Sequence, residues 1–350
     1  MIQIPCFNEE ATLPGTLADL PRQVEGIETV EWLVIDDGST DRTVEVAREH
    51  GVDHIVRLTN NRGLAAAFQA GLDASLKLGA DIIVNTDADN QYYGGDIPKL
   101  VTPILAGHAD MVIGDRKTDE IEHFSPLKKR LQRLGSAVVR RASGTNVPDT
   151  TSGFRAYNRE AGLQMQVVSK FTYTLESIIQ AGKMLVAVDH VPIRTNEQTR
   201  ESRLFPSTAA YVRRNTVSIF RIYAMYEPLR VFLAAAAFAA VVGAVIWARF
   251  LYFYLFSEEP GSHIQSLILG STLFIVAVQL AALGVVGDIQ AGTRVLQQRA
   301  LERVRRMELH LGVEPSHYEP GAVETGQPAT TGAGAGRATG KTEDREALKL

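Results

Sequence analysis

The chain of 350 residues contains a single cysteine, Cys6, so it cannot form an intramolecular disulfide. This scarcity fits a reducing compartment and excludes a disulfide scaffold. A free cysteine usually packs as a small apolar side chain, and a nucleophilic Cys6 would need a histidine base that the sequence does not place beside it.

Several signals of common function classes are also missing. The formal net charge of −4 gives no reason to expect nucleic acid as a partner. No Gly-x-Gly-x-x-Gly follows the first expected strand and no Walker loop occurs, which argues against a dinucleotide or an NTP bound by a P-loop. The apolar start at 1–5 is short and carries no basic residues, so we expect no signal peptide there.

Residues 1–200 alternate short apolar runs with segments of helical periodicity. This alternation predicts an α/β domain with a mostly parallel sheet and helices on both faces. The expected strands are 2–5, 30–35, 54–58, 82–86, 111–114 and 185–193, and the expected helices are 12–23, 42–50, 63–78, 97–106 and 125–141.

The apolar strand expected at 82–86 runs directly into Asp87 and Asp89, with Gln91 two residues further on. Two carboxylates one residue apart can reach one hard cation, and Mg²⁺ or Mn²⁺ prefers such oxygen ligands. Taken alone, Asp-x-Asp is equally typical of a solvated turn.

Four polar turns follow expected parallel strands, at 5–9, 36–39, 87–89 and 114–116. Right-handed crossovers bring the carboxyl ends of such strands to one edge, where ligands bind in open parallel sheets. The sequence therefore predicts a site for a polar, metal-bound ligand at this edge, with Arg116 adding a cation to the carboxylates.

The last third of the chain differs in kind. A basic, aromatic segment at 207–227 is typical of an amphipathic helix on a membrane surface. Segments 231–248 and 264–287 contain no charged residue and are long enough to cross a bilayer, although two buried core helices are the alternative. Arginines flank both segments and the connection between them has no Lys or Arg, which favours a cytosolic α/β domain and two cytosolic termini at the cell membrane.

We therefore expect five segments, with a disordered tail rich in Gly, Ala, Thr and Glu at the end. They are a cytosolic domain at 1–205, an amphipathic helix at 206–230, two membrane spans at 231–288, a basic cytosolic helix at 289–312 and the tail at 313–350.

Five motifs in order resemble family 2 glycosyltransferases of the GT-A fold. More narrowly, they resemble the polyprenyl-phosphate hexose synthases, the branch that contains dolichol-phosphate mannose synthase and undecaprenyl-phosphate hexose synthases. The motifs are Pro5-x-Phe7-Asn8-Glu9-Glu10, Ile35-Asp36-Asp37-Gly38-Ser39, Asp87-Ala88-Asp89-Asn90-Gln91, Gly114-Asp115-Arg116 and Ser152-Gly153-Phe154-Arg155.

This resemblance implies a nucleotide-sugar donor and a divalent metal, Mg²⁺ or Mn²⁺. The residues that would bind the donor are Pro5, Phe7, Glu9, Asp37, Asp87 and Arg116. Those that would hold the metal are Asp87, Asp89 and Gln91.

The resemblance also implies a polyprenyl-phosphate acceptor in the bilayer. Its phosphate would meet Lys129 and the loop that carries Arg200, Ser202 and Arg203. This loop departs from the family's Arg-Gly-x-Ser-Lys pattern, because the Gly is absent, one residue is missing and Arg203 replaces Lys.

A lipid phosphate is already an anion, so it would attack the sugar with little help from a base and would invert the anomeric centre. The expected catalytic residues are Asp89, Arg116 and Asp149, and either Asp89 or Asp149 would act as base if the acceptor were a hydroxyl. Two alternative functions are a glycosyltransferase with a hydroxyl acceptor and an inactive, transferase-like membrane scaffold. The sequence is also compatible with a homo-oligomer.

Overall fold

The computed structural model describes residues 1–117, 136–137, 139–141, 143–167, 173–196, 217, 220–221, 223–256 and 264–321. Lys129, Arg200, Ser202 and Arg203 lie outside these ranges, as do most of the helix expected at 125–141, the start of the expected amphipathic helix and residues 322–350.

The described part of the α/β domain is built on one eight-stranded sheet, in the order β7-β5-β6-β4-β1-β2-β3-β8. Its strands are β1 (Ile2–Cys6), β2 (Trp32–Asp36), β3 (His54–Arg57), β4 (Ile82–Asn85), β5 (Met111–Asp115), β6 (Arg155–Asn158), β7 (Val188–Pro192) and β8 (Tyr318–Pro320).

The parallel sheet expected from the sequence is confirmed at its centre. Strands β4, β1, β2 and β3 pair in parallel, and so do β5 and β7. Strand β6 was not expected: it lies antiparallel between β4 and β5. Its four residues begin with Arg155 and end with Asn158, so they contain no apolar run from which a strand could be predicted.

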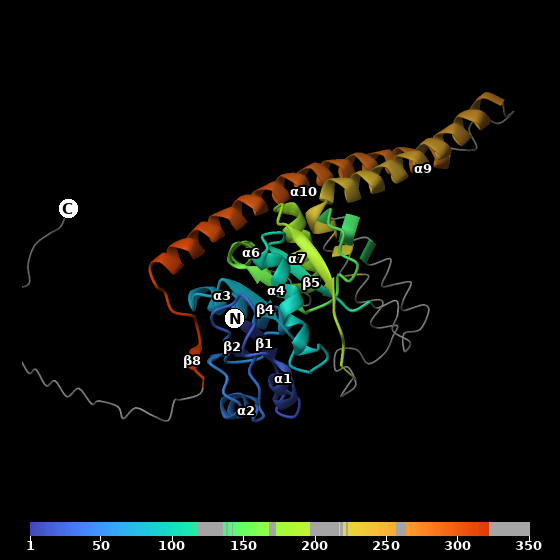
Figure 1. The fold of residues 1–350 in the computed structure, drawn as a ribbon. Coiled ribbons are helices and arrows are strands. Elements are labelled where there is room, and N and C mark those ends of the chain that lie inside the picture. The colour runs from blue at the N-terminus through green and yellow to red at the C-terminus, as the bar shows by residue number, and fades with distance from the viewer. Residues whose placement is uncertain are drawn as a thin grey trace, which may run out of the picture.

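Helices cover both faces of the sheet, as expected (Figure 1). They are α1 (Leu13–Asp19), α2 (Thr43–Glu49), α3 (Leu64–Lys77), the 3₁₀ helix η1 (Gly94–Asp96), α4 (Ile97–Leu105), α6 (Arg159–Gln164), α7 (Tyr173–Lys183), α9 (Pro228–Phe256) and α10 (Ile264–His310). Helix α1 ends earlier than expected, at Asp19, because Pro21 disfavours helical backbone at the residue before it.

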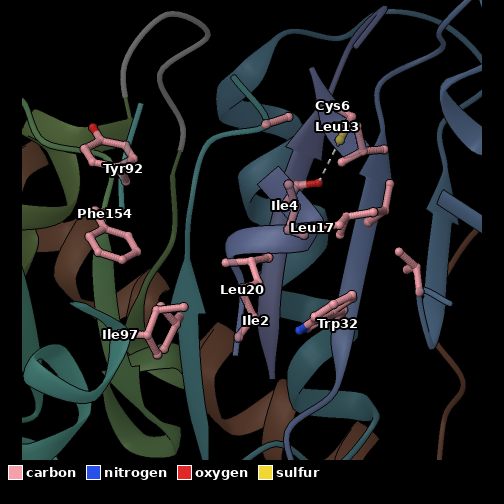
Figure 2. Packing of buried hydrophobic residues seen from close by; sticks show 14 of the residues in the cluster. Ile2, Ile4, Cys6, Leu13, Leu17, Leu20, Trp32, Tyr92, Ile97 and Phe154 are labelled. Atoms are coloured by element: carbon pink, nitrogen blue, oxygen red, sulfur yellow. Dashed lines mark hydrogen bonds between the residues drawn. The ribbon is translucent and has the colours of Figure 1, made fainter. Parts of the chain in front are cut away.

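The two faces of the sheet have separate cores because side chains alternate along a strand. On one face, Ile2 and Ile4 of β1 pack with Leu13 and Leu17 of α1 and with Ile97 of α4 (Figure 2). On the other face, α3, α6 and α7 contribute the buried side chains Phe68, Leu72, Leu163, Tyr173 and Ile178.

Helices α9 and α10 are 29 and 47 residues long and run side by side (Figure 1). By length and composition both could cross a membrane. Small residues line their contact: a Cβ placed on Gly243 would lie 3.2 Å from the carbonyl oxygen of Gly270. Large apolar side chains such as Phe238 (72% exposed) and Val278 (69% exposed) remain uncovered, which argues against two buried core helices.

The second half of α10 leaves α9 and lies across the catalytic domain (Figure 1). The Arg305 guanidinium is buried and donates to the carbonyl oxygens of Leu163 (3.1 Å) and Met165 (2.7 Å) and to Gln166 Oε1 (2.8 Å). Arg294 lies 3.8 Å from the buried carboxylate of Glu176 on α7. The expected second span and the expected cytosolic helix are therefore one continuous helix.

Strand β8 corrects the expectation of a tail that is disordered from residue 313. Tyr318–Pro320 pairs antiparallel with β3, the His54 ring lies 3.0 Å from the Tyr318 hydroxyl, and Arg48 forms an ion pair with Glu319 (2.5 Å). The open edge of β3 supplies the partners for these three residues, so their own composition gives no strand signal.

Replacing Arg305 with methionine should detach α10 from the domain. The change leaves the buried carbonyls of Leu163 and Met165 without a donor, at a cost of about 2 kcal/mol. We expect the melting temperature of the purified protein in detergent to fall by at least about 4 °C. Arg299→Met on the same helix, whose exposed side chain has no partner among the described residues, should leave it unchanged; an equal fall in both variants would contradict the docking role of Arg305.

Candidate functional site

The loops after β1 and β2 hold each other through side-chain and backbone hydrogen bonds. Asn8 has a positive φ of 55°; its N–H donates to Ser39 Oγ (2.9 Å), and its Oδ1 accepts from the N–H of Thr40 (2.8 Å). The N–H of Glu9 donates to Thr43 Oγ1 (2.9 Å). Asn tolerates this left-handed backbone better than most residues, so Asn8 fixes the turn on which Phe7 and Glu9 stand.

The residues expected to bind the donor lie around this turn. Pro5 is buried in β1, whereas Phe7 is 40% exposed at the sheet edge. Glu9 is buried and its Oε2 accepts from the Thr12 hydroxyl (2.6 Å).

Asp37 fixes the backbone that leads into α3. Its two carboxylate oxygens accept from the N–H groups of Arg62 (2.7 Å) and Gly63 (2.8 Å). Burial raises the pKa of Asp37, against the two amide hydrogen bonds and the charge of Arg62. The structure thus gives Asp37 a positioning role at the site, and a direct contact with the donor stays a prediction.

Asp87 and Asp89 follow β4 directly. Asp89 Oδ1 accepts from the N–H of Gln91 (3.2 Å), and Asn90 between them has a φ of 57°. Burial, and next the charge of Asp89, raise the pKa of Asp87 to about 7, whereas Arg116 and Arg155 act in the opposite direction. Glu9 also raises this pKa, which places the first loop within electrostatic reach of Asp87.

The residues present fit a divalent cation that shares its shell with a substrate. No group of three or more His, Cys, Asp or Glu that could hold a metal occurs among the described residues. The Asp87 and Asp89 carboxylates offer hard oxygen donors, and two repelling carboxylates are stabilised by a cation between them. The remaining positions would have to come from substrate oxygens or water.

Arg116 and the buried Asp149 form a partly exposed, bidentate ion pair. Arg116 Nε donates to Asp149 Oδ2 (2.7 Å) and Nη2 to Asp149 Oδ1 (3.1 Å), and Nη2 also donates to Thr151 Oγ1 (2.8 Å). Burial opposes the charge of Asp149, but Arg116 outweighs it and holds the pKa of the carboxyl below its ordinary value. The third nitrogen, Nη1, has no partner among the described residues and is free to bind an anion.

The loop from 149 to 155 is held in place by hydrogen bonds from Arg155, a residue for which no role was predicted from the sequence. Arg155 is fully buried and donates to the carbonyl oxygens of Ser152 (2.7 Å), Thr150 (3.1 Å) and Thr174 (2.8 Å) and to Ser177 Oγ (2.7 Å). Tyr92 and Asn85, which also bind this loop, were missed; the signal for Asn85 was a polar residue at the end of an apolar strand.

The chain after β7 is anchored beside the carboxylate turn. Arg194 binds the buried Asp96 through its N–H (2.7 Å) and its guanidinium (2.6 Å), and its guanidinium stacks 4.1 Å above the Tyr93 ring. The N–H of Asn196 donates to the carbonyl of Gln91 (2.9 Å). Asn196, the last described residue before Arg200, therefore lies next to Gln91.

The profile of glycosyl transferase family 2 matches residues 1–162. A dolichyl-phosphate hexose transferase of Haloferax volcanii is 34% identical over 204 residues, which cover 57% of this chain and 84% of that protein. The chain belongs to glycosyl transferase family 2.

Other comparisons agree with this assignment. A UDP-N-acetylglucosamine–dolichyl-phosphate N-acetylglucosaminyltransferase of Methanococcus voltae is 30% identical, with 55% of this chain and 83% of that protein covered. Glucosyl-3-phosphoglycerate synthase from Mycobacterium tuberculosis, crystallised with Mn²⁺, UDP-glucose and phosphoglyceric acid, superimposes with a TM-score of 0.52 at 22% identity. The match covers 64% of this chain and 79% of that one, and it shows that the fold is of the GT-A type.

The family 2 domain thus brings the described site residues to one edge of its sheet. Apart from Pro5, which lies within β1, the expected catalytic, donor-binding and metal-binding residues that the structure describes all follow β1, β2, β4 or β5 or lie in the 149–155 loop. Their individual roles stay predictions, as do those of Lys129, Arg200, Ser202 and Arg203.

Replacing Asp149 with asparagine should destabilise the protein, because Arg116 keeps its charge without a counter-charge. We expect a loss of about 2 kcal/mol in the free energy of unfolding near pH 7. The lowered pKa means that the ion pair contributes fully above the ordinary range of Asp and is lost as the pH falls through the native pKa. The difference in the free energy of unfolding between Asp149→Asn and the wild-type protein should therefore become smaller below about pH 4. Denaturant unfolding across pH measures it, with the exposed Asp189→Asn as control; a difference that persists in acid would contradict the pairing.

Proposed function

We propose that this glycosyltransferase is a membrane-bound polyprenyl-phosphate hexose synthase that inverts the anomeric centre of its donor sugar. The observation that carries the proposal is the joining of the Asp87–Asp89 site to two apolar helices through the continuous α10. An acceptor with a long hydrocarbon tail stays in the bilayer, so an enzyme that uses it needs its site held at the membrane surface. The named activities of the Haloferax and Methanococcus relatives support the same acceptor class.

The donor is a nucleoside-diphosphate hexose, with GDP-mannose and UDP-glucose as the two candidates. Phe7 would contact the base, Glu9 and Asp37 would order the loops around the nucleoside, and Arg116 would bind the diphosphate through its free Nη1. Asp87, Asp89 and Gln91 would hold Mg²⁺ or Mn²⁺. When bound, such an ion acts as a Lewis acid that stabilises charge on the leaving diphosphate.

The acceptor phosphate would attack the anomeric carbon from the face opposite the diphosphate. A bond forms between a phosphate oxygen and that carbon, the bond from the carbon to the diphosphate oxygen breaks, and the nucleoside diphosphate leaves. Lys129, Arg200, Ser202 and Arg203 would bring the phosphate to the site, since cations are needed to gather two polyanions. The ion pair with Arg116 makes Asp149 a weak base, which favours an acceptor that is already ionised over a hydroxyl.

The catalytic domain and both flanks of the two spans would lie in the cytosol. Arg230 at the start of α9 and Arg294 and Arg299 in the second half of α10 lie on the side of the catalytic domain, and the connection at 257–263 has no Lys or Arg. Any homo-oligomer is outside this proposal.

A transfer assay on membranes tests the reaction. Radiolabelled GDP-mannose and UDP-glucose are each offered with polyprenyl phosphate and Mg²⁺ or Mn²⁺. We expect label from one donor to enter the lipid phase, and EDTA, Asp87→Ala or Asp89→Ala to lower the rate at least ~100-fold, because a bound metal supplies several kcal/mol.

Two further results complete the assay. Arg200→Ala should raise the KM for polyprenyl phosphate without changing the KM for the donor. Hydrolysis of a donor without any label in lipid would contradict the polyprenyl-phosphate acceptor and point to a hydroxyl acceptor, and full activity of Asp87→Ala and Asp89→Ala would contradict the metal site.

Thiol labelling tests the orientation in the membrane. Cys6 is buried, so a cysteine introduced by Ser262→Cys becomes the accessible thiol. A membrane-impermeant maleimide should label it in intact cells, whereas Arg299→Cys should be labelled only after permeabilisation. The reverse pattern would place the catalytic domain on the outer side.

A further inference from the structure

Both backbone polar groups of Gly153 are held by side chains that flank the Asp87 turn. The N–H of Gly153 donates to the Tyr92 hydroxyl oxygen (2.9 Å), and its carbonyl oxygen accepts from Asn85 Nδ2 (2.9 Å). Asn85 is the last residue of β4, and Tyr92 follows the carboxylate turn. The turn and the 149–155 loop are thereby locked to each other on both sides of Asp87.

Gly153 lies directly against the Asp87 carboxylate. A Cβ placed on Gly153 would lie 3.1 Å and 3.2 Å from the two Asp87 oxygens and 2.7 Å from the Tyr173 hydroxyl. No hydrogen bond joins the Asp87 carboxylate to the part of the chain that the structure describes. Packing against Gly153, and not hydrogen bonding, therefore sets the position of Asp87.

The two side chains that hold Gly153 are themselves fixed. Asn85 Nδ2 also donates to the Tyr173 hydroxyl (3.0 Å), and Asn85 Oδ1 accepts from Gln3 Nε2 (2.9 Å). The Tyr92 ring stacks on the Phe154 ring (Figure 2), with centroids 5.1 Å apart and planes 10° from parallel. Asn85, Tyr92 and Phe154 are all buried, so this network has little freedom to move.

We propose that Asn85 and Tyr92 are positioning residues that act through Gly153 to fix the Asp87 carboxylate for a divalent cation. They touch neither donor nor acceptor; they set where a cation can bind and, through it, where a donor diphosphate lies. The proposal rests on the metal site of the proposed function. It predicts that loosening Gly153 weakens cation binding while the fold and the Asp87 side chain remain.

The test measures Mn²⁺ binding to the full-length protein in detergent, by loss of the free Mn²⁺ signal in electron paramagnetic resonance, with UDP and with GDP present. Tyr92→Phe keeps the ring stack and removes the hydroxyl that accepts from Gly153. We expect its Mn²⁺ affinity to fall about tenfold, as for other groups that orient metal ligands. Tyr93→Phe is the matched control: it changes the neighbouring tyrosine, whose ring contact with Arg194 a phenylalanine retains, and it should bind as wild type.

Gly153→Ala is the second variant and should weaken binding at least as much, because its methyl group must displace Asp87 or Tyr173. Gly292→Ala, on α10 with open space around it, is the control for this change. Rescue by excess Mn²⁺ distinguishes a loss of Mn²⁺ affinity from a general loss of structure. In the transfer assay, excess Mn²⁺ should restore the rate of Tyr92→Phe to that of Tyr93→Phe, although the unpaired N–H of Gly153 lowers the melting temperature of Tyr92→Phe.

The outcomes separate the two proposals. Unchanged Mn²⁺ affinity in Tyr92→Phe and Gly153→Ala, together with a loss in Asp87→Asn, would overturn the positioning role and leave the metal site standing. A lower rate in Tyr92→Phe that excess Mn²⁺ does not restore would also overturn it. If the wild-type protein binds no Mn²⁺ with either nucleotide, the metal site of the proposed function fails and the positioning role fails with it.

Discussion

The site depends on one constraint: two carboxylates, those of Asp87 and Asp89, lie close together at a partly buried strand end. Asp87 and Asp89 repel each other, and burial raises the pKa of Asp87 to about 7. The surrounding chain offsets this with positive charge: Arg116 from the end of β5 and Arg155 from β6 both favour the ionised form of Asp87. Arg155 binds only carbonyl and hydroxyl oxygens in the described chain, so its charge is not neutralised by a direct partner. The insertion of β6 between β4 and β5 therefore has an electrostatic consequence, since it brings this buried cation beneath the carboxylate turn.

The same insertion explains the geometry of the 149–155 loop. Because β6 runs antiparallel to its neighbours, its amino end lies at the edge where β4 and β5 end, and the loop that enters it passes over Asp87. Asp149 at one end of this loop holds Arg116, and Gly153 at the other end supports Asp87. One loop thus sets the positions of both Arg116, the proposed ligand of the diphosphate, and Asp87, a proposed ligand of the metal, and so couples the two parts of the proposed donor site.

Sequence reasoning located the strand-end turns because each one interrupts an apolar run, and parallel topology then required them to share an edge. It did not find β6 or β8, because four residues that start with Arg155 and three that start with Tyr318 depend on neighbouring strands for their conformation. The pairing of Arg116 with Asp149 joins residues 33 apart, and no local pattern encodes a contact over that distance. Asp37 was expected at the donor, yet its carboxylate binds the backbone of Arg62 and Gly63, a role that only the three-dimensional structure reveals.

Helix α7 connects the site to the helix that leads into the apolar spans. At its start, the Tyr173 hydroxyl accepts from Asn85, and Thr174 and Ser177 bind Arg155. One turn further, Glu176 faces Arg294 of α10, and at its end Lys183 pairs with Glu227 just before α9. A helix is stiff over such a length, and its polar contacts at both ends resist sliding. An acceptor that is anchored in a bilayer can present its phosphate only at a fixed height. For the proposed polyprenyl-phosphate acceptor, the described contacts of α7 and α10 would hold the edge that carries Asp87 at a fixed distance from the two apolar helices.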